Sequence, residues 1–384
     1  MGGASGPGRG VTGPRSRRTI LIAGGGTGGH LMPALALATR LRERRPDLEP
    51  VLVGADRGIE ARLLPKRDFR YHLLPVEPFY RHQWWKNLRW PLVAGRLLSG
   101  LRRVFSVEQP IAVLGSGGYA SGPAVWLAAR RGLPTAIQEQ NAFPGLATRL
   151  LSRRVRHVYL GMPEAERRLR LGPDTEVFNT GNPIPPPDPQ RRATALRRFG
   201  LEQDGSPSRR AVLLVTGGSQ GALAINEAVA GWLDSGGGEG MSLLWAAGHG
   251  TYQRFARYHR PPGVQVFDFL DPIADGYAVA TLAVSRAGMM TGAELCAWGL
   301  PSVLIPLPTA AQDHQRYNAE ALMAAGAARM ILQRDLTSAT LGTAIRALLQ
   351  DRTRLGAMAE AARQRGKPRA ADEIVSHLLT LLGL

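Results

Sequence analysis

Two glycine-rich turns, far apart in the chain, each follow an apolar run and precede a run with helical periodicity. The first turn spans residues 24–30 after the apolar run 19–23, and the second spans residues 217–222 after the run 211–216. A strand, a glycine turn and a helix together begin a parallel α/β sheet, whose ligands bind beyond the carboxyl ends of the strands near a helix N-terminus. Two such starts predict two α/β domains, each a doubly wound sheet, that face one cleft.

Length and composition agree with two domains. The chain has 384 residues, 44% of them hydrophobic, which is enough to bury two cores. Cys296 is the only cysteine, so no disulfide forms within the chain and a reducing cytosol is the natural compartment.

The formal net charge of +18 favours an anionic partner: nucleic acid, an acidic lipid surface or a phosphorylated substrate. Residues 1–18 are rich in Gly, Pro, Ser and Arg, and we expect a disordered basic leader without the apolar core of a secretory signal. We find no run of about 18 apolar residues, so no helix is expected to span a membrane.

Short apolar runs alternate with helical stretches on both sides of a proline-dense segment. The runs before it lie at 51–54, 111–114, 134–137 and 155–160, and those after residue 211 lie at 243–245, 264–267, 282–285 and 302–305. The segment 181–189 contains five prolines and predicts an interdomain linker, because proline continues neither helix nor central strand. Residues 371–384 predict an amphipathic helix.

Three residues are candidates for chemistry from their positions alone. His30 stands at the start of the first predicted helix, where the helix dipole disfavours imidazolium, so it is either a general base or a histidine that only hydrogen-bonds the loop. Glu294 is expected in the first turn of a helix after residues 285–292, where it either binds the diol of a ribose or only satisfies the helix dipole. Arg286 is a candidate phosphate partner, and the polar segment 312–318 suits recognition of sugar hydroxyls or is an exposed helix start.

A tryptophan- and arginine-rich segment spans residues 79–103. Three of the chain's seven tryptophans lie here, and residues 81–103 contain six basic and no acidic residues. Tryptophan favours the headgroup region of a bilayer and basic side chains attract anionic lipid. The same composition could clamp single-stranded nucleic acid, or its aromatic residues could be core.

No metal or cofactor is expected. The chain has no D-x-D motif and no cluster with metal-ligand spacing, so a divalent metal held by the protein is not suggested, and no Lys-Ser/Thr follows either glycine turn.

These segments, in order, resemble the MurG family of peptidoglycan glycosyltransferases, which make lipid II from lipid I. The resemblance covers nearly everything after the leader. The segments that carry it are 25–30 (GGTGGH), 115–123 (GSGGYASGP), 139–141 (EQN), 181–183 (GNP), 217–222 (GGSQGA) and 286–294.

The resemblance implies a GT-B fold with an N-terminal acceptor and membrane domain (19–184 plus 367–384) and a C-terminal UDP-sugar donor domain (185–366). It implies inverting, metal-independent transfer of N-acetylglucosamine (GlcNAc) from UDP-GlcNAc to the C4 hydroxyl of lipid I. The expected setting is peripheral, on the cytoplasmic face of an anionic bacterial inner membrane. The expected roles are cell-wall synthesis, shape and division beside other proteins of those processes, without nucleic acid.

The family's functional residues carry over position by position. The catalytic residue would be His30. Donor binding would fall to Ser219, Gln220, Phe269, Leu270, Arg286, Thr291, Glu294, Gln315 and Asn318. Acceptor binding would fall to Thr27, Gly28, Gly29, Tyr119 and Asn141. The membrane patch would be Trp84, Trp85, Lys86, Arg89 and Trp90.

The chain departs from the family's pattern in three places. Pro185 stands where the family usually has Arg, Gln138 stands where it often has His, and His314-Gln315 replaces a tandem Gln pair. Two rival functions stay open on the sequence: another GT-B transferase with a lipid acceptor, such as a diacylglycerol glycosyltransferase, or a basic nucleic-acid-binding α/β protein.

Overall fold

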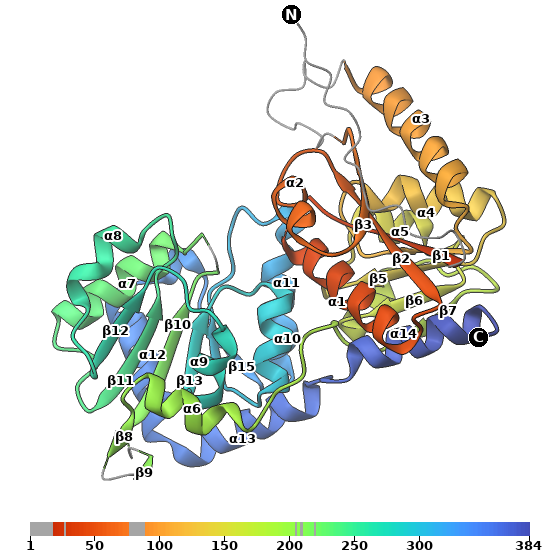
Figure 1. Ribbon diagram of the computed structural model, residues 1–384. Helices are drawn as coiled ribbons and strands as arrows, with labels where there is room; N and C mark the ends of the chain where they lie inside the picture. Colours follow the sequence, from red (N-terminus) through yellow and green to blue (C-terminus); the bar gives the residue numbers. More distant parts are fainter. Residues whose placement is uncertain (1–17, 27, 77–88, 204–205, 208–209, 219) are drawn as a thin grey trace, which may run out of the picture. The chain divides into compact units, whose positions relative to one another are not determined.

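The computed structural model describes residues 18–26, 28–76, 89–203, 206–207, 210–218 and 220–384 (Figure 1). The chain divides into two compact units. Unit 1 comprises the chain up to Gln140, Pro144–Pro183 and Arg369–Leu384, and unit 2 comprises Asn141–Phe143 and Ile184–Pro368. The boundaries expected from the sequence are 184/185 and 366/367.

Unit 1 is built on a seven-stranded parallel sheet in the order β3-β2-β1-β4-β5-β6-β7. The strand order reverses between β1 and β4, which is where a doubly wound sheet binds its ligands. The strands are β1 (Arg18–Ala23), β2 (Leu48–Ala55), β3 (Arg70–Leu74), β4 (Ala112–Gly115), β5 (Thr135–Glu139), β6 (His157–Leu160) and β7 (Glu176–Phe178).

Helices cover both faces of this sheet because β1 is apolar on both sides. Ile20 and Ile22 pack against α1 (Gly28–Arg44) and α14 (Ala370–Leu381), whereas Leu21 and Ala23 share a core with α3 (Trp90–Glu108) and α4 (Ser121–Arg130). Such a strand, buried on both faces, reads as a continuous apolar run. The shorter helices of unit 1 are α2 (Glu60–Leu63), η1 (Leu64–Lys66), α5 (Leu146–Leu151) and η3 (Pro163–Arg168).

The last helix of the chain, α14, packs on α1 of unit 1. Ile374, Val375 and Leu378 are buried in their shared core. Arg40 Nε of α1 donates to Asp372 Oδ1 at 2.6 Å, so an ion pair accompanies the apolar contact.

Unit 2 repeats the architecture with six parallel strands in the order β12-β11-β10-β13-β14-β15. The order again reverses next to the first strand, between β10 and β13. The strands are β10 (Ala211–Thr216), β11 (Met241–Ala246), β12 (Val264–Phe267), β13 (Leu282–Ser285), β14 (Ser302–Leu304) and β15 (Ala328–Met330). A separate two-stranded sheet pairs β8 (Glu202–Gln203) with β9 (Ser206–Pro207).

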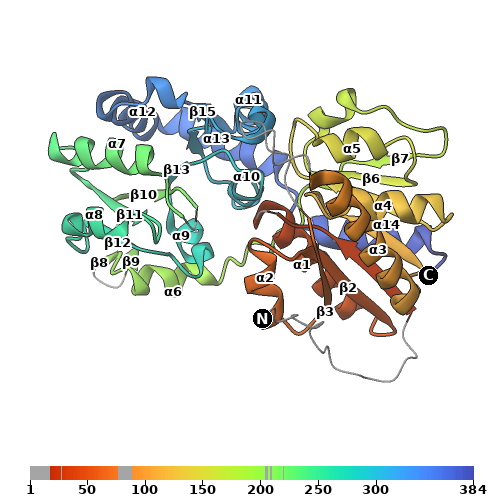
Figure 2. The same cartoon turned by 90° about the horizontal axis from the view of Figure 1, so that it is seen from above.

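The two faces of the unit 2 sheet are also covered (Figure 2). Leu213 and Val215 of β10 pack with α7 (Leu223–Asp234) and α12 (Ser338–Gln350), while Leu214 contacts α9 (Ile273–Val279) on the opposite face. The other helical segments are α6 (Arg191–Arg198), α8 (Tyr252–Phe255), η4 (Ala256–Tyr258), α10 (Met289–Ala297), η5 (Ala311–Asp313), α11 (His314–Ala324), η6 (Gln333–Asp335) and α13 (Arg352–Arg365).

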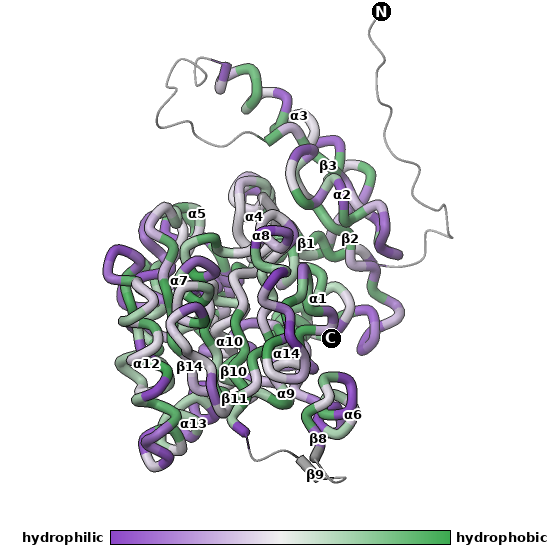
Figure 3. Tube along the Cα trace, turned by 90° about the vertical axis from the view of Figure 1, so that its left-hand side faces the viewer, coloured by the Kyte–Doolittle hydropathy of each residue, from purple (hydrophilic) through white to green (hydrophobic). Residues whose placement is uncertain are grey.

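Helix α3 is packed along one half only. Leu97, Leu101 and Val104 are buried, whereas Leu92 near its N-terminus is 69% exposed. Figure 3 shows apolar and polar residues alternating along this helix. Its C-terminal end is held by buried Glu108, which accepts from Arg70 (2.6 Å) and His72 (2.7 Å). Burial opposes ionisation of Glu108, but these partners outweigh it and lower the pKa of the carboxyl.

The sequence-based fold class, two doubly wound α/β domains, is confirmed by these two sheets. The apolar runs expected as strands coincide with β1, β2, β4, β5, β6 and β10–β14. Strands β3, β7 and β15, which lie at sheet edges, and the short strands β8 and β9 were not expected from the sequence.

Candidate functional site

Both glycine turns lie where the strand order reverses. In unit 1 the turn after β1 meets the turn after β4, and Gly25 N donates to Gly117 O at 3.3 Å. In unit 2 the turn at 217–221 follows β10, and Arg286 follows the neighbouring strand β13. The local sequence pattern therefore places each turn at the position where a doubly wound sheet binds ligands.

The amide groups of the first turn are bound within the protein. Gly24 N donates to Val53 O at 3.0 Å, Gly25 N to Gly117 O, and Gly26 N to Oε1 of Glu60, a carboxylate buried beneath the turn. The described amides of Gly24, Gly25 and Gly26 are therefore not free to bind an anion. The amides at the start of α1 remain as candidates, because the first turn of a helix leaves its N–H groups without intrahelical partners.

His30 lies in that first turn of α1, as expected. Its Nδ1 atom is 2.9 Å from Oε1 of Gln140, and its main-chain carbonyl accepts from Ser116 Oγ at 2.9 Å. Main chain and ring are thus both held by the residues that follow β4 and β5. This geometry suits a fixed imidazole rather than a mobile surface histidine.

Of the other predicted acceptor residues, Gly28, Gly29 and Tyr119 lie at this turn. Tyr119 is 52% exposed, and its ring borders Gly26. Gly28 and Gly29 begin α1, while Thr27 lies outside the described residues. Asn141, which follows β5, groups with unit 2 and accepts from Asn318 Nδ2 at 3.1 Å.

The second glycine turn is open at Gly218, although Gly217 and Gly221 are closely packed. A side chain built at Gly218 would meet nothing within 4 Å, and Gln220 is exposed. Gly221 N donates to Gly218 O at 2.9 Å, which closes the turn before α7. Ser219 lies outside the described residues. The turn keeps room for a ligand beside the N-terminus of α7, whose dipole favours an anion.

Glu294 is partly buried and lies in the second turn of α10, not in the first turn as expected from the sequence, because the helix begins at Met289. The hydroxyl of buried Tyr277 donates to Glu294 Oε2 at 2.8 Å. Burial raises the pKa of Glu294, and the Tyr277 bond opposes that rise. Burial, together with the neighbouring carboxylate, also raises the pKa of Tyr277 well above its ordinary value.

Arg286 is directed to the end of the neighbouring strand. Its Nη1 atom donates to Ile305 O at 3.3 Å and to Pro306 O at 3.4 Å, and burial lowers its pKa. Both of these acceptors are neutral carbonyl oxygens, so neither contact neutralises the charge of the guanidinium group. The side chain therefore keeps the charge that a phosphate requires.

Phe269 and Leu270 follow β12 with different exposures. The Phe269 ring is 45% exposed and stacks on His249, with centroids 5.4 Å apart, whereas the Leu270 side chain is buried. The backbone of Leu270 forms no hydrogen bond within the described part of the chain. An exposed ring next to an unused backbone edge is what a nucleobase needs, although His249 already covers one face of the ring.

The predicted sugar-binding residues of α11 are partly engaged. Gln315 Oε1 accepts from Leu307 N at 3.0 Å. Asn318 is buried and binds Ala142 N (2.9 Å), Asn141 Oδ1 (3.1 Å) and Ala287 O (3.2 Å). These bonds make Asn318 a support for residues 141–142. Thr291 is half-buried in the first turn of α10. Contact of any of these three with a sugar or phosphate stays a prediction.

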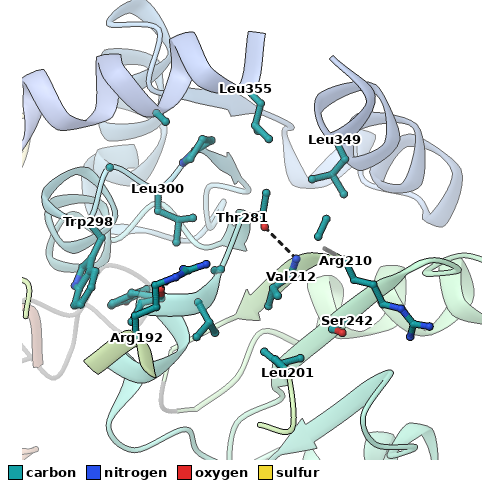
Figure 4. A pocket seen from close by; sticks show the side chains of 18 of the residues that line it. Arg192, Leu201, Arg210, Val212, Ser242, Thr281, Trp298, Leu300, Leu349 and Leu355 are labelled. Carbon is teal, nitrogen blue, oxygen red and sulfur yellow. Dashed lines mark hydrogen bonds between the residues drawn. The ribbon is translucent and has the colours of Figure 1, made fainter. Parts of the chain in front are cut away.

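A cavity of about 610 Å³ lies within unit 2 (Figure 4). Its lining includes residues at the amino ends of the strands, such as Val212, Ser242 and Thr281, with Thr281 Oγ1 accepting from Val212 N at 3.1 Å. None of the described residues predicted to bind the donor lines this cavity, although Tyr277, the hydrogen-bond partner of Glu294, does.

Part of the predicted membrane patch can be placed. Arg89 is exposed and Trp90 begins α3, while Trp84, Trp85 and Lys86 lie outside the described residues. Within the described ranges no helix is long and apolar enough to cross a membrane, and no three His, Cys, Asp or Glu side chains gather as metal ligands do.

Several residues without a predicted role lie beside the predicted site residues of each unit. Glu60 lies beneath the first turn, Tyr277 binds Glu294, and Gln138, Gln140 and Asn182 lie behind His30. For Gln138 and Gln140 the available signal was the polar run 138–141 at the carboxyl end of β5, and for Asn182 it was the Gly-Asn-Pro turn at 181–183.

Two Rossmann-like units, each with a glycine turn at its switch point, are the architecture of the GT-B fold, to which many glycosyltransferases belong. The sequence matches the glycosyltransferase family 28 N-terminal domain over residues 20–160 and the C-terminal domain over residues 212–374. The crystal structure of Acinetobacter baumannii MurG superposes with a TM-score of 0.75 at 26% identity, covering 95% of this chain and 99% of that chain. A putative UDP-N-acetylglucosamine 2-epimerase from Listeria monocytogenes, at 17% identity and a TM-score of 0.64, shares the fold alone.

Relatives of known name match almost end to end. The chain is 38% identical over 374 residues to the UDP-N-acetylglucosamine–N-acetylmuramyl-(pentapeptide) pyrophosphoryl-undecaprenol N-acetylglucosamine transferase of Desulforudis audaxviator, covering 95% of this chain and 98% of the relative. It is 37% identical over 370 residues to the protein of the same name from Moorella thermoacetica. The chain belongs to this family of N-acetylglucosamine transferases.

Proposed function

We propose that this chain transfers GlcNAc from UDP-GlcNAc to lipid I and so produces lipid II for peptidoglycan synthesis. The observation that carries the proposal is the end-to-end match, at 38% identity, to a transferase whose name states this donor sugar and this lipid-linked acceptor. The two units supply what such a reaction needs, since each has a helix N-terminus beside a glycine turn for one of two diphosphates.

The donor is proposed to bind unit 2. Uracil lies against Phe269 and the unused backbone edge of Leu270, and the Glu294 carboxylate accepts hydrogen bonds from the ribose hydroxyls. The diphosphate lies at the open turn around Gly218 and at the N-terminus of α10, within reach of Arg286. The exposures of Phe269 and of this turn support the assignment.

The transfer is proposed as one direct displacement with inversion. His30 takes the proton of the C4 hydroxyl of lipid I, and the oxygen attacks the anomeric carbon of GlcNAc. The bond from that carbon to the diphosphate breaks, and UDP leaves with the electron pair. Backbone N–H groups and helix dipoles, rather than a metal ion, stabilise the charge that develops on the leaving diphosphate.

The acceptor is lipid-linked, so the enzyme is proposed to work at the anionic cytoplasmic face of the inner membrane. The exposed N-terminal half of α3, with Leu92 and Arg89, supports a docking surface there. Apolar side chains would enter the headgroup region while arginines attract anionic lipid.

Acceptor profiling tests the proposal. Purified enzyme with UDP-GlcNAc is offered a lipid I analogue or diacylglycerol, and the products are identified by mass. The proposal expects one N-acetylhexosamine on lipid I and none on diacylglycerol; the reverse result would establish the rival lipid glycosyltransferase.

His30→Ala is expected to bind UDP-GlcNAc normally but to lose roughly 100-fold or more in kcat, the scale of general-base catalysis. Full turnover by this variant would remove His30 from the base role.

A further inference from the structure

Three buried amide side chains form a line behind the His30 ring. Gln138, Gln140 and Asn182 are each at most 3% exposed. His30 Nδ1 lies 2.9 Å from Gln140 Oε1, Gln140 Nε2 donates to Gln138 Oε1, and Gln138 Nε2 donates to Asn182 Oδ1 at 2.9 Å. The ring of His30 is thus the last member of a continuous hydrogen-bonded chain.

The direction of this chain is set by two main-chain carbonyls. Gln140 Nε2 is 2.7 Å from Ser116 O, and Asn182 Nδ2 is 3.1 Å from Gln140 O. A carbonyl oxygen only accepts, so both contacts must be made by amide nitrogens. The contact to Ser116 O sets the orientation of the Gln140 amide, and the contact to Gln140 O sets that of the Asn182 amide. Both assignments agree: each amide oxygen faces the next group toward His30, from which it accepts a hydrogen bond.

The direction fixes the tautomer of His30. Because Gln140 Oε1 can only accept, Nδ1 of His30 must carry a proton, and a neutral imidazole then has its lone pair on Nε2. We propose that Gln140, oriented by Gln138 and Asn182, is a positioning residue that keeps this proton on Nδ1 and reserves Nε2 to receive the acceptor's hydroxyl proton. The inference rests on the proposed function, in which His30 is the base.

Gly117 leaves room for the bond between the ring and the amide. A Cβ atom at this position would lie 2.4 Å from His30 Nδ1 and 3.3 Å from Gln140 Oε1, and φ is +90°. Ser116, next to it, holds the carbonyl of His30 through Oγ and the amide of Gln140 through its own carbonyl oxygen. The turn after β4 therefore fixes both partners of the bond.

Nitrogen NMR of the full-length protein labelled with ¹⁵N-histidine measures the tautomer directly. The chain has eight histidines, and the His30 signals are assigned by their loss in His30→Ala. At a pH where the ring is neutral, we expect a protonated Nδ1 and an unprotonated Nε2. In Gln140→Met we expect Nε2–H, the form that free histidine prefers, to become populated. Nε2–H in the unmodified protein, or an unchanged spectrum in Gln140→Met, would overturn the proposal.

Kinetics separate positioning from general structural support. Gln140→Met is expected to lower kcat about 10- to 100-fold, within the range that general-base catalysis contributes, with donor KM unchanged. In a His30→Ala background the same substitution should cause no further loss, because the base it orients is gone. A further loss of similar size there would show that Gln140 only supports the fold, a point that the thermal unfolding midpoint of each variant also checks.

Gln138 offers a rescue test. Gln138→Met breaks the chain, whereas Gln138→His can accept at one ring nitrogen and donate from the other. We expect Gln138→His to recover most of the kcat and the Nδ1–H signature that Gln138→Met loses. Equal losses in both variants would contradict the proposal that hydrogen bonds through Gln138 orient Gln140. If His30→Ala proves fully active, the base role fails, while the NMR experiment still reports whether the amides set the tautomer.

Discussion

The Tyr277 hydroxyl donates a 2.8 Å hydrogen bond to Oε2 of Glu294 within unit 2, where the tyrosine is buried and the glutamate partly buried. The bond joins a helix on one side of β10 to the carboxylate proposed to bind ribose. Burial makes the Glu294 carboxylate costly to ionise, and the tyrosine recovers part of that cost. This pair therefore links the packing of the sheet to recognition of the donor.

Replacing Glu294 with Ala is expected to raise the donor KM by roughly 10- to 100-fold, since hydrogen bonds to a charged group contribute about 1.5 to 3 kcal/mol. Affinity for the lipid acceptor should be unchanged. Steady-state kinetics with each substrate varied in turn measure both values. An unchanged donor KM would remove Glu294 from the ribose site.

Donor binding should depend on pH through the same carboxyl. The pKa of Glu294 is raised, so the ionised form that accepts ribose hydroxyls is lost as pH falls through that raised pKa. In Tyr277→Phe the opposing hydrogen bond is absent, the pKa rises further, and the acid limb of UDP binding moves to higher pH. Calorimetric titration with UDP across a pH series, in the unmodified protein and in Tyr277→Phe, measures the two acid limbs of binding. Acid limbs that coincide in the two proteins would contradict this role of Tyr277.

Two glycines of the second turn differ in what surrounds them. Both have positive φ, but a Cβ at Gly221 would lie 2.1 Å from Ala247 O whereas one at Gly218 meets nothing. Gly218→Ala should therefore cost only the backbone strain, about 1 to 2 kcal/mol. Gly221→Ala should cost clearly more, because the main chain of the turn must move. Chemical denaturation of the two variants compares them, and equal losses would show that the close approach is unimportant.

The stability of unit 1 should fall in mild acid because of His157. This buried ring binds Tyr159 and packs on Phe178; burial lowers its pKa, Glu176 opposes the shift, and His377 and Arg156 add to it. Below about pH 6.5 the unfolded histidine binds a proton that the folded one resists, so the free energy of unfolding falls as pH decreases.

His157→Gln is expected to flatten that pH dependence while keeping a group able to bond Tyr159. His249→Gln, at an exposed histidine of unit 2, is the matched control and should keep it. Urea denaturation at pH 5.5 and pH 7.5 gives the change in the free energy of unfolding with pH for each protein. A His157→Gln protein with the original slope would assign the effect to another group.

Membrane docking should depend on the exposed half of α3 and the tryptophans before it. Leu92→Ser is expected to weaken binding to anionic vesicles by roughly 5- to 20-fold, since burying a leucine contributes about 1 to 2 kcal/mol. Trp84→Ser, Trp85→Ser and Trp90→Ser together should weaken it more. Leu171→Ser, at another exposed leucine of unit 1, is the control. Vesicle sedimentation that finds no difference between Leu92→Ser and the control would refute docking by α3.

The fold was predictable where strands are buried on both faces. Central strands such as β1 and β10 need apolar residues on both sides, so they appear in the sequence as continuous runs. Strands β3, β7 and β15 lie at sheet edges and are shorter or half-buried, with Arg70, Glu176 and Arg329 among their residues. With few fully buried positions, these segments lack the continuous apolar run that made even the edge strand β12 (Val264–Phe267) predictable.

The site was predictable only as far as its local motifs. The glycine turns and His30 can be recognised in the sequence because a turn is made by consecutive residues. The bond from Gly26 to Glu60 and the amide chain from His30 to Asn182 are made by residues that only the folded sheet brings together. Which turn amides stay available, and which tautomer His30 adopts, therefore required the structure.

The central claim is transfer of GlcNAc to lipid I without a metal ion, and its most direct test is the release of UDP. UDP-GlcNAc and a soluble lipid I analogue are incubated with the enzyme, with and without EDTA, and free UDP is measured over time. We expect release that requires both substrates and proceeds at the same rate in EDTA. No acceptor-dependent release, or release abolished by EDTA and restored by a divalent cation, would contradict the account.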